Sequence, residues 1–264
     1  MPGHRLPEPS TLKPAMTRIS APLFEFLSGV ERSYAALIAH AEPAPQGEPD
    51  LGGKLLYSSE LDAESCARIV AANIAGAATI VASSDPDLQR QANRDGVVDF
   101  VVTSLDEALR ILKNELRKRQ PVAVCVALTP ETVEAEMRER GVVPDLASPL
   151  LSGLSPASDA EMLLLWSVSS APARWLPKLD ALASDCLAPG DRIGRRWLRL
   201  APRYLGRRAQ NVRLMRCDQA VAEPFVAGVR QRTESGEVDV AVEIRLEAPG
   251  NSHVLEFQLP VRSS

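Results

Sequence analysis

The sequence of 264 residues is long enough to form one large domain or two modest ones. A hydrophobic content of 45% and a charged content of 24% exclude a wholly disordered or fibrous chain, and a net charge of −4 favours neither nucleic acid nor membrane. The cysteines lie far apart with no Cys-x-x-Cys pair, so we expect no metal site. No apolar run opens the chain or reaches the length of a membrane span, so we expect no signal peptide and a cytoplasmic protein.

The first half of the chain alternates between strand and helix patterns. A Pro-rich arm (1–20), an amphipathic helix (22–40) and a linker (41–53) come first. Strands are then predicted at 54–59, 78–84, 97–104, 121–128 and 142–148, and helices at 61–77, 85–96, 105–120 and 130–141. Short connections between alternating elements predict an α/β fold with a Rossmann-like parallel sheet sandwiched by helices.

The pattern changes after residue 150. Helices are predicted at 158–168 and 173–188, followed by a basic helix at 190–209 that bends or ends near Pro202. Four β-like segments follow, at 211–217, 225–232, 237–248 and 253–259, and turn sequences between the last three predict an antiparallel meander. The predicted organisation is therefore an N-terminal region (1–52), a Rossmann-like domain (53–150) and a smaller α+β region (151–264).

The turn after the first strand of a Rossmann fold normally holds a pyrophosphate, because glycines let backbone N–H groups approach it. Here residues 58–65 contain no glycine, and Glu60, Asp62 and Glu64 lie at the start of the next helix. These acids stabilise an empty helix start and would repel a diphosphate, so we expect no cofactor and no standard binding of NAD. Further along, Asp85 either contacts a ribose or caps the helix that begins at Pro86.

Residues 50–156 resemble the NAD-binding domain of the urocanase (urocanate hydratase) family. The resemblance is carried by four stretches: Gly53-Lys54-Leu55 through Asn73-Ile74-Ala75-Gly76, the Gly96 turn, Thr103-Ser104-Leu105-Asp106 and Val143-Pro144-Asp145-Leu146. It implies the fold, and it implies a family reaction in which NAD acts as an electrophile for the addition of water to an imidazole acrylate.

The family's functional motifs are replaced in this sequence. Its Gly-Leu-Gly-Gly-Met-Ser-Gly loop corresponds to residues 60–66, which contain no glycine, and its acidic residue after the second strand corresponds to Ser83. Its Tyr-His-Gly-Asn stretch falls on residues 126–129, and its Gly-Ser-Asp-Gln-Thr-Ser stretch on residues 147–152, where only the two serines match. These departures predict a urocanase-like protein without urocanate hydratase activity and without catalytic residues.

Nine arginines and no acid lie between residues 192 and 216, interleaved with Trp197 and Tyr204. Two interpretations are open: an anion or nucleic-acid site, or a docking face for acidic parts of the same chain or of a partner subunit. The low aromatic content and net acidity make nucleic acid the weaker one. The candidate ligand or anion contacts from the whole sequence are Ser58, Ser59, Asp85, Thr129, Arg195, Arg196 and Arg199.

The C-terminal acids Glu234, Glu237, Asp239 and Glu243 are placed on the final hairpin, where Asp239 and Glu243 alternate with valines in the pattern of a solvated strand face; a catalytic pair is the alternative. The leading hypothesis is a non-catalytic binding or interaction module that forms a homo-oligomer or binds a protein partner. The alternatives are an enzyme or sensor that binds a different small ligand at the Rossmann switch point, and a nucleic-acid binder that uses the Arg-rich helix.

Overall fold

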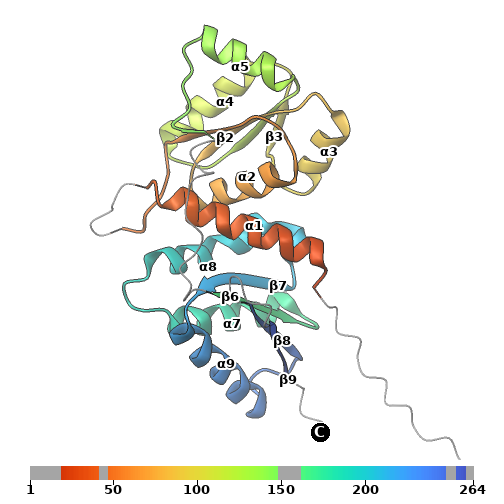
Figure 1. Cartoon of the computed structure of the whole chain (residues 1–264), viewed down its shortest axis with the longest axis vertical. Coiled ribbons are helices and arrows are strands. Elements are labelled where there is room, and N and C mark those ends of the chain that lie inside the picture. The colour runs from red at the N-terminus through yellow and green to blue at the C-terminus, as the bar shows by residue number, and fades with distance from the viewer. Residues whose placement is uncertain (1–18, 42–46, 148–161, 248–253, 260–264) are drawn as a thin grey trace, which may run out of the picture.

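The computed structural model describes residues 19–41, 47–147, 162–247 and 254–259 (Figure 1). The predicted arm at 1–20 lies almost entirely outside these ranges, and so does the middle of the predicted linker, at 42–46.

A five-stranded parallel sheet forms the first unit, with strand order β3-β4-β2-β1-β5. Its strands are β1 (Leu55–Ser58), β2 (Ala78–Ala82), β3 (Phe100–Val102), β4 (Ala123–Val126) and β5 (Leu146–Ala147). Its helices are α2 (Ala63–Ala75), α3 (Pro86–Arg94), α4 (Leu105–Lys118) and α5 (Pro130–Glu139). The buried residues of α2 and α3 belong to one core and those of α4 and α5 to another, so the helices cover both faces, as predicted.

Side chains at the helix starts explain where these helices begin. Asp62 accepts a hydrogen bond from the backbone N–H of Ser65, and Asp85 accepts from Asp87 and Leu88. Ser104 and Thr129 cap α4 and α5 in the same way. Each cap satisfies an N–H group that the helix itself cannot pair, which fixes the boundaries that the sequence predicted.

A four-stranded antiparallel sheet forms the second unit, with strand order β7-β6-β8-β9. Its strands are β6 (Met162–Val168), β7 (Val212–Cys217), β8 (Val242–Glu247) and β9 (Val254–Leu259). Its helices are α7 (Pro172–Cys186), α8 (Arg192–Leu205), the short 3₁₀ helix η1 (Gly206–Ala209) and α9 (Gln219–Glu234).

The predicted helix at 158–168 is wrong over its described part. Met162–Val168 is the strand β6, paired on both sides by β7 and β8, and residues 158–161 lie outside the described residues. Leu164, Leu165 and Trp166 are all buried, because a central strand covered on both faces reads as a continuous apolar run. Such a run does not distinguish a buried strand from a buried helix by periodicity.

The predicted strand at 225–232 is also wrong, because these residues lie within α9. Asp218 caps this helix, and Val221, Phe225 and Val229 follow one another at the four-residue spacing of a buried helical face. The predicted strand at 237–248 begins only at Val242, and the turn proposed at 248–251 lies outside the described residues. The predicted basic helix does not end at Pro202 but continues to Leu205.

Helix α1 (Ala21–Ile38) lies between the two units and joins their cores (Figure 1). It packs along α2 on one side and against β7 on the other. The buried Tyr34 places its ring 5.1 Å from that of Trp197 in α8, and Glu31 pairs with Arg216 in β7 at 2.5 Å. One continuous apolar core therefore extends from the α2 side of the parallel sheet to the antiparallel sheet.

Candidate functional site

The turn between β1 and α2 is closed by the chain's own side chains. Asp62 accepts from Ser65 N at 2.7 Å, and Leu61 beside it is buried. Glu64 forms an ion pair with Arg68 at 2.5 Å, so it adds a paired carboxylate to the first turn of the helix. One of the N–H groups that could hold an anion at this helix start, that of Ser65, is thus engaged by Asp62.

Ser58 and Ser59 stand at the carboxyl end of β1. Ser58 is fully buried, and its hydroxyl has no hydrogen-bond partner among the described residues. Ser59 is half-buried. Leu56 and Ser58 alternate with Leu55 and Tyr57 along β1, so Ser58 belongs to the face of the sheet that α2 covers.

The carboxyl ends of β2 and β4 are adjacent, and the helices that follow them, α3 and α5, lie on opposite faces. In open α/β sheets, such a switch point is where ligands bind. Asp85 and Thr129 stand at this edge as the N-caps of α3 and α5, which confirms the capping interpretation of Asp85. The structure thus brings four candidates, Ser58, Ser59, Asp85 and Thr129, to one edge of the sheet, and two of them are engaged in capping.

The ionisable groups near this edge have pKa values that disfavour the deprotonated, nucleophilic form at neutral pH. Burial raises the pKa of both the Cys66 and Cys125 thiols to about 11, which keeps them protonated at neutral pH. The pKa of the Tyr57 phenol is also raised. Burial is the largest cause, and the hydrogen bond to Glu134 raises this pKa further. Among the described residues, no group of three or more His, Cys, Asp or Glu side chains could hold a metal ion.

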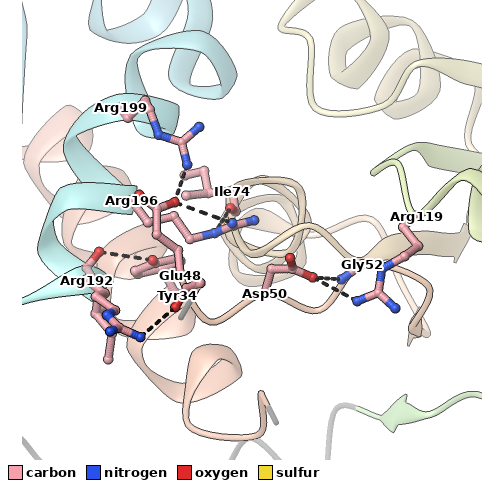
Figure 2. A network of polar contacts seen from close by, with 11 residues as sticks. Tyr34, Glu48, Asp50, Gly52, Ile74, Arg119, Arg192, Arg196 and Arg199 are labelled. Carbon is pink, nitrogen blue, oxygen red and sulfur yellow. Dashed lines mark hydrogen bonds and ion pairs between the residues drawn. The ribbon is translucent and has the colours of Figure 1, made fainter. Parts of the chain in front are cut away.

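The basic helix α8 docks onto α2 and onto the segment that precedes β1 (Figure 2). Arg196 is almost fully buried, and its Nε donates to the carbonyl of Ile74 near the C-terminus of α2 at 3.2 Å. Glu48 lies between Arg196, at 3.9 Å, and Arg199. At the start of this helix, Arg192 donates to the carbonyl of Gly47 at 3.0 Å, and the Tyr34 hydroxyl donates to the carbonyl of Ile193 at 3.2 Å.

Other arginines of this region also bond within the chain. Arg195 donates to Ser184 Oγ at 3.1 Å and to the carbonyl of Leu187 at 3.2 Å, close to the end of α7. Three further arginines pair with acids that lie far away in the sequence: Arg208 with Asp95, Arg213 with Asp180, and Arg216 with Glu31. Of the two interpretations left open, these contacts favour docking within the same chain.

The sequence alone did not predict which acidic residues pair with the arginines of residues 192–216. Glu48 is separated from Arg199 by 151 positions, and no local spacing links two such residues. The only signal was indirect: a strongly basic segment within an acidic chain needs acids elsewhere to compensate it.

The assignment of Glu243 to a solvated strand face is wrong. Glu243 is buried in β8, where it lies opposite Ser167 of the neighbouring strand β6. Asp239 and Glu237 are exposed before β8 begins, and Glu237 lies 3.5 Å from Arg232. The alternation of acids and valines does not predict an exposed face here, because β8 is an inner strand between β6 and β9 rather than a half-exposed one.

The parallel sheet, its strand order and the helices on both faces define a Rossmann-like α/β domain. A family model for the urocanase Rossmann-like domain matches residues 30–158, which confirms the predicted resemblance and extends it into α1. Residues 30–158 therefore form a Rossmann-like domain of the urocanase type. It is 26% identical over 167 residues, 58% of its length, to S-methyl thiourocanate hydratase from Variovorax sp. (strain JCM 16519 / RA8), and it covers 29% of that relative. None of the described helices is long and apolar enough to cross a membrane.

Proposed function

We propose that this chain is a non-catalytic urocanase-family protein that acts as a binding or interaction module and does not bind NAD in the standard Rossmann mode. The observation that carries the proposal is the hydrogen bond from Ser65 N to Asp62 at the start of α2. A carboxylate occupies one of the donors that a pyrophosphate would use and adds negative charge beside it, and no glycine between residues 58 and 65 lets a ligand approach the backbone.

The polar positions of the family site support the same proposal. Residues 126–129, where the family carries Tyr-His-Gly-Asn, read Val-Ala-Leu-Thr. Val126 is buried in β4, and Thr129 caps α5. Aliphatic side chains neither transfer a proton nor hydrogen-bond a substrate, and positioned acid–base groups contribute about 10²–10⁴-fold to a rate.

Calorimetry and a hydration assay test this proposal together. We expect no heat of binding with NAD, and no loss of absorbance from urocanate or S-methyl thiourocanate on prolonged incubation with the purified chain and NAD. The latter substrate is included because a relative carries it in its name. Turnover that scales with protein concentration and survives repurification contradicts the proposal, as does a micromolar dissociation constant for NAD.

A second candidate function is binding of a different small ligand at the carboxyl edge of the parallel sheet. It is favoured by the buried Ser58 hydroxyl, because a buried polar atom without a partner is uncommon in proteins. A thermal-shift screen with NADP, ATP and imidazole compounds distinguishes it. A ligand at 100 times its dissociation constant stabilises the folded state by about 2.7 kcal/mol, whereas the first proposal expects no shift.

Binding of nucleic acid through the arginine-rich segment is the least supported alternative, because Arg195, Arg196 and Arg199 already contact groups of this chain. We expect no retention on heparin or DNA at physiological salt. A retention that falls steeply with salt would reinstate this alternative.

A further inference from the structure

The margin of the parallel sheet formed by β3 and α3 exposes large apolar side chains. Phe100 and Val101 of β3 are 48% and 40% exposed, and Leu88 of the neighbouring α3 is 47% exposed. Among the described residues, only Val143 and Ile193 are further large apolar side chains of this kind, and both lie elsewhere in the chain. Three of the five exposed large apolar side chains of the described residues thus lie on the neighbouring elements α3 and β3, whose place in the fold Figure 1 shows, and such patches mark interaction sites.

This margin also ends the sheet. In the described part of the chain, β3 is hydrogen-bonded to β4 on one side only. An edge strand presents unpaired N–H and C=O groups that pair readily with another strand. The occupant of this margin must therefore offer both backbone groups and apolar side chains.

We propose that a second copy of this chain occupies the margin, with β3 pairing antiparallel to β3 of the copy about a two-fold axis near Val101. Two such edges would form one continuous sheet across the two copies. A two-fold axis makes the interface self-complementary, which is the commonest arrangement of homo-oligomers.

The alternation of side chains along β3 fits this pairing. Val101 is in register with Cys125, whose side chain belongs to the core under α2 and α3, and Phe100 is in register with Val124 on the opposite face. Opposed residues of antiparallel strands share a face. An axis at Val101 therefore sets Val101 against its own copy on the α3 face, and Phe100 against Val102 of the copy on the other face.

The charges of α3 favour a second copy over another occupant. Asp87 lies in the first turn of α3, where it also pairs with Arg90 at the surface, and Arg94 lies in the last turn; both are exposed. The same two-fold axis sets α3 antiparallel to α3 of the copy, so that the acidic end of each helix faces the basic end of the other. The helix dipoles are then also antiparallel. A patch with both signs in this order is complementary to itself.

The arginine-rich segment is a weaker candidate for assembly. Arg195 and Arg199, which the sequence proposed for this role, contact Ser184 and Glu48 of the same chain. Their guanidinium groups would have to leave these partners before they could bind a second subunit.

Light scattering coupled to size exclusion tests the proposal on the full chain at micromolar concentration. We expect the mass of two chains. Val101→Lys should reduce it to that of one, because it places two like charges together at the axis. Val143→Lys is the matched control, since Val143 is 82% exposed but lies outside the margin, and it should leave the mass of two chains. Circular dichroism checks that both variants are folded.

Charge-reversal variants at Asp87 and Arg94 test whether the partner at this margin is a second copy of the chain. Asp87→Arg and Arg94→Asp should each weaken the dimer by about tenfold, because each places like charges across the axis. The double variant should recover most of the loss, since the opposite charges then face each other in reversed order. A single-chain mass for the unaltered protein overturns the proposal and leaves the margin to an extended segment of another protein. A dimer that survives Val101→Lys overturns it as well.

Discussion

A single buried guanidinium, that of Arg196, contacts both the end of α2 and the segment before β1. Its Nε donates to the carbonyl of Ile74, and Glu48 lies 3.9 Å away. We predict that Arg196→Ala lowers the free energy of unfolding by about 2–3 kcal/mol, because it removes a charged hydrogen bond and leaves a carbonyl group without its partner. Urea denaturation measures this change.

Arg203 supplies the control on the same helix. It is exposed, and its guanidinium stacks on Tyr204 at 5.3 Å from the ring centre. Arg203→Ala should change the free energy of unfolding by less than about 0.5 kcal/mol, as surface substitutions usually do. Equal losses in the two variants would mean that the Ile74 contact does not stabilise the fold.

The thiol of Cys66 gives a prediction about pH. Burial raises its pKa from an ordinary value of 9.0 to about 11, so the folded protein holds the proton more tightly than the unfolded chain does. The resulting stability is complete below pH 9 and is lost as the pH rises toward 11. We predict that iodoacetamide modifies Cys66 slowly at pH 8 and faster above pH 10, as measured by peptide mass spectrometry.

Urea-unfolded protein is the reference for this measurement, since its thiols are exposed and should react at ordinary rates at pH 8. Rapid modification of Cys66 in folded protein at pH 8 would point to an activated thiolate. That result would contradict the absence of a nucleophile from the proposed function.

Among the elements, α2 lies within the segment that matches the urocanase family model, and its start lacks the glycines of the family loop. Asp62 caps the helix, and Gly76 ends it with a φ of 96°, a conformation that favours glycine. We predict that Asp62→Ala destabilises the protein by about 1 kcal/mol in thermal or urea unfolding. Asp85→Ala, which removes the cap of the short helix α3, tests whether the effect is general.

Asp62→Ala also distinguishes two reasons for the expected absence of NAD binding: the occupied Ser65 N–H and the missing glycines. Removing Asp62 releases the Ser65 N–H but restores no glycine. We therefore expect Asp62→Ala to stay without measurable NAD binding in calorimetry. Binding gained from this one substitution would show that the cap alone blocks the site.

Elements that the sequence predicted well have boundaries set by local chemistry. The caps Asp62, Asp85, Ser104 and Thr129 are residues that precede helices by their own preference, and the buried strands between them are rich in valine and isoleucine. The helix α9 was missed because its valines were interpreted as a strand, although Phe225 and Val229 lie one helical turn apart. The strand β6 could not be distinguished locally, since its burial comes from β7 and β8.

The candidate site was only partly predictable for the same reason. Ser58 is the last residue of β1, and Asp85 and Thr129 come shortly after β2 and β4 end. Parallel strands bring their carboxyl ends to one edge of the sheet. The contacts of Arg196 and Arg199 depend on how α8 docks onto α2, and this is a property of the whole molecule rather than of any window of sequence.

At the scale of the whole molecule, the shared core predicts that both units unfold together. The three tryptophans of the chain, Trp166, Trp175 and Trp197, all lie in the second unit, so their fluorescence reports on that unit, whereas far-UV circular dichroism reports on the helices of both. Since α1 packs on both units and one core runs between them, we expect the two signals to give the same melting temperature.

A substitution in α1 sharpens this test. Tyr34 is buried, its hydroxyl donates to the carbonyl of Ile193 at 3.2 Å, and its ring packs on Trp197. Tyr34→Ala should cost about 3–5 kcal/mol, the range for a large buried aromatic side chain, and should lower both melting temperatures equally. A circular dichroism transition that precedes the fluorescence change would show that the parallel sheet unfolds separately. The core around α1 would then be a contact between two independent domains rather than the centre of one cooperative fold.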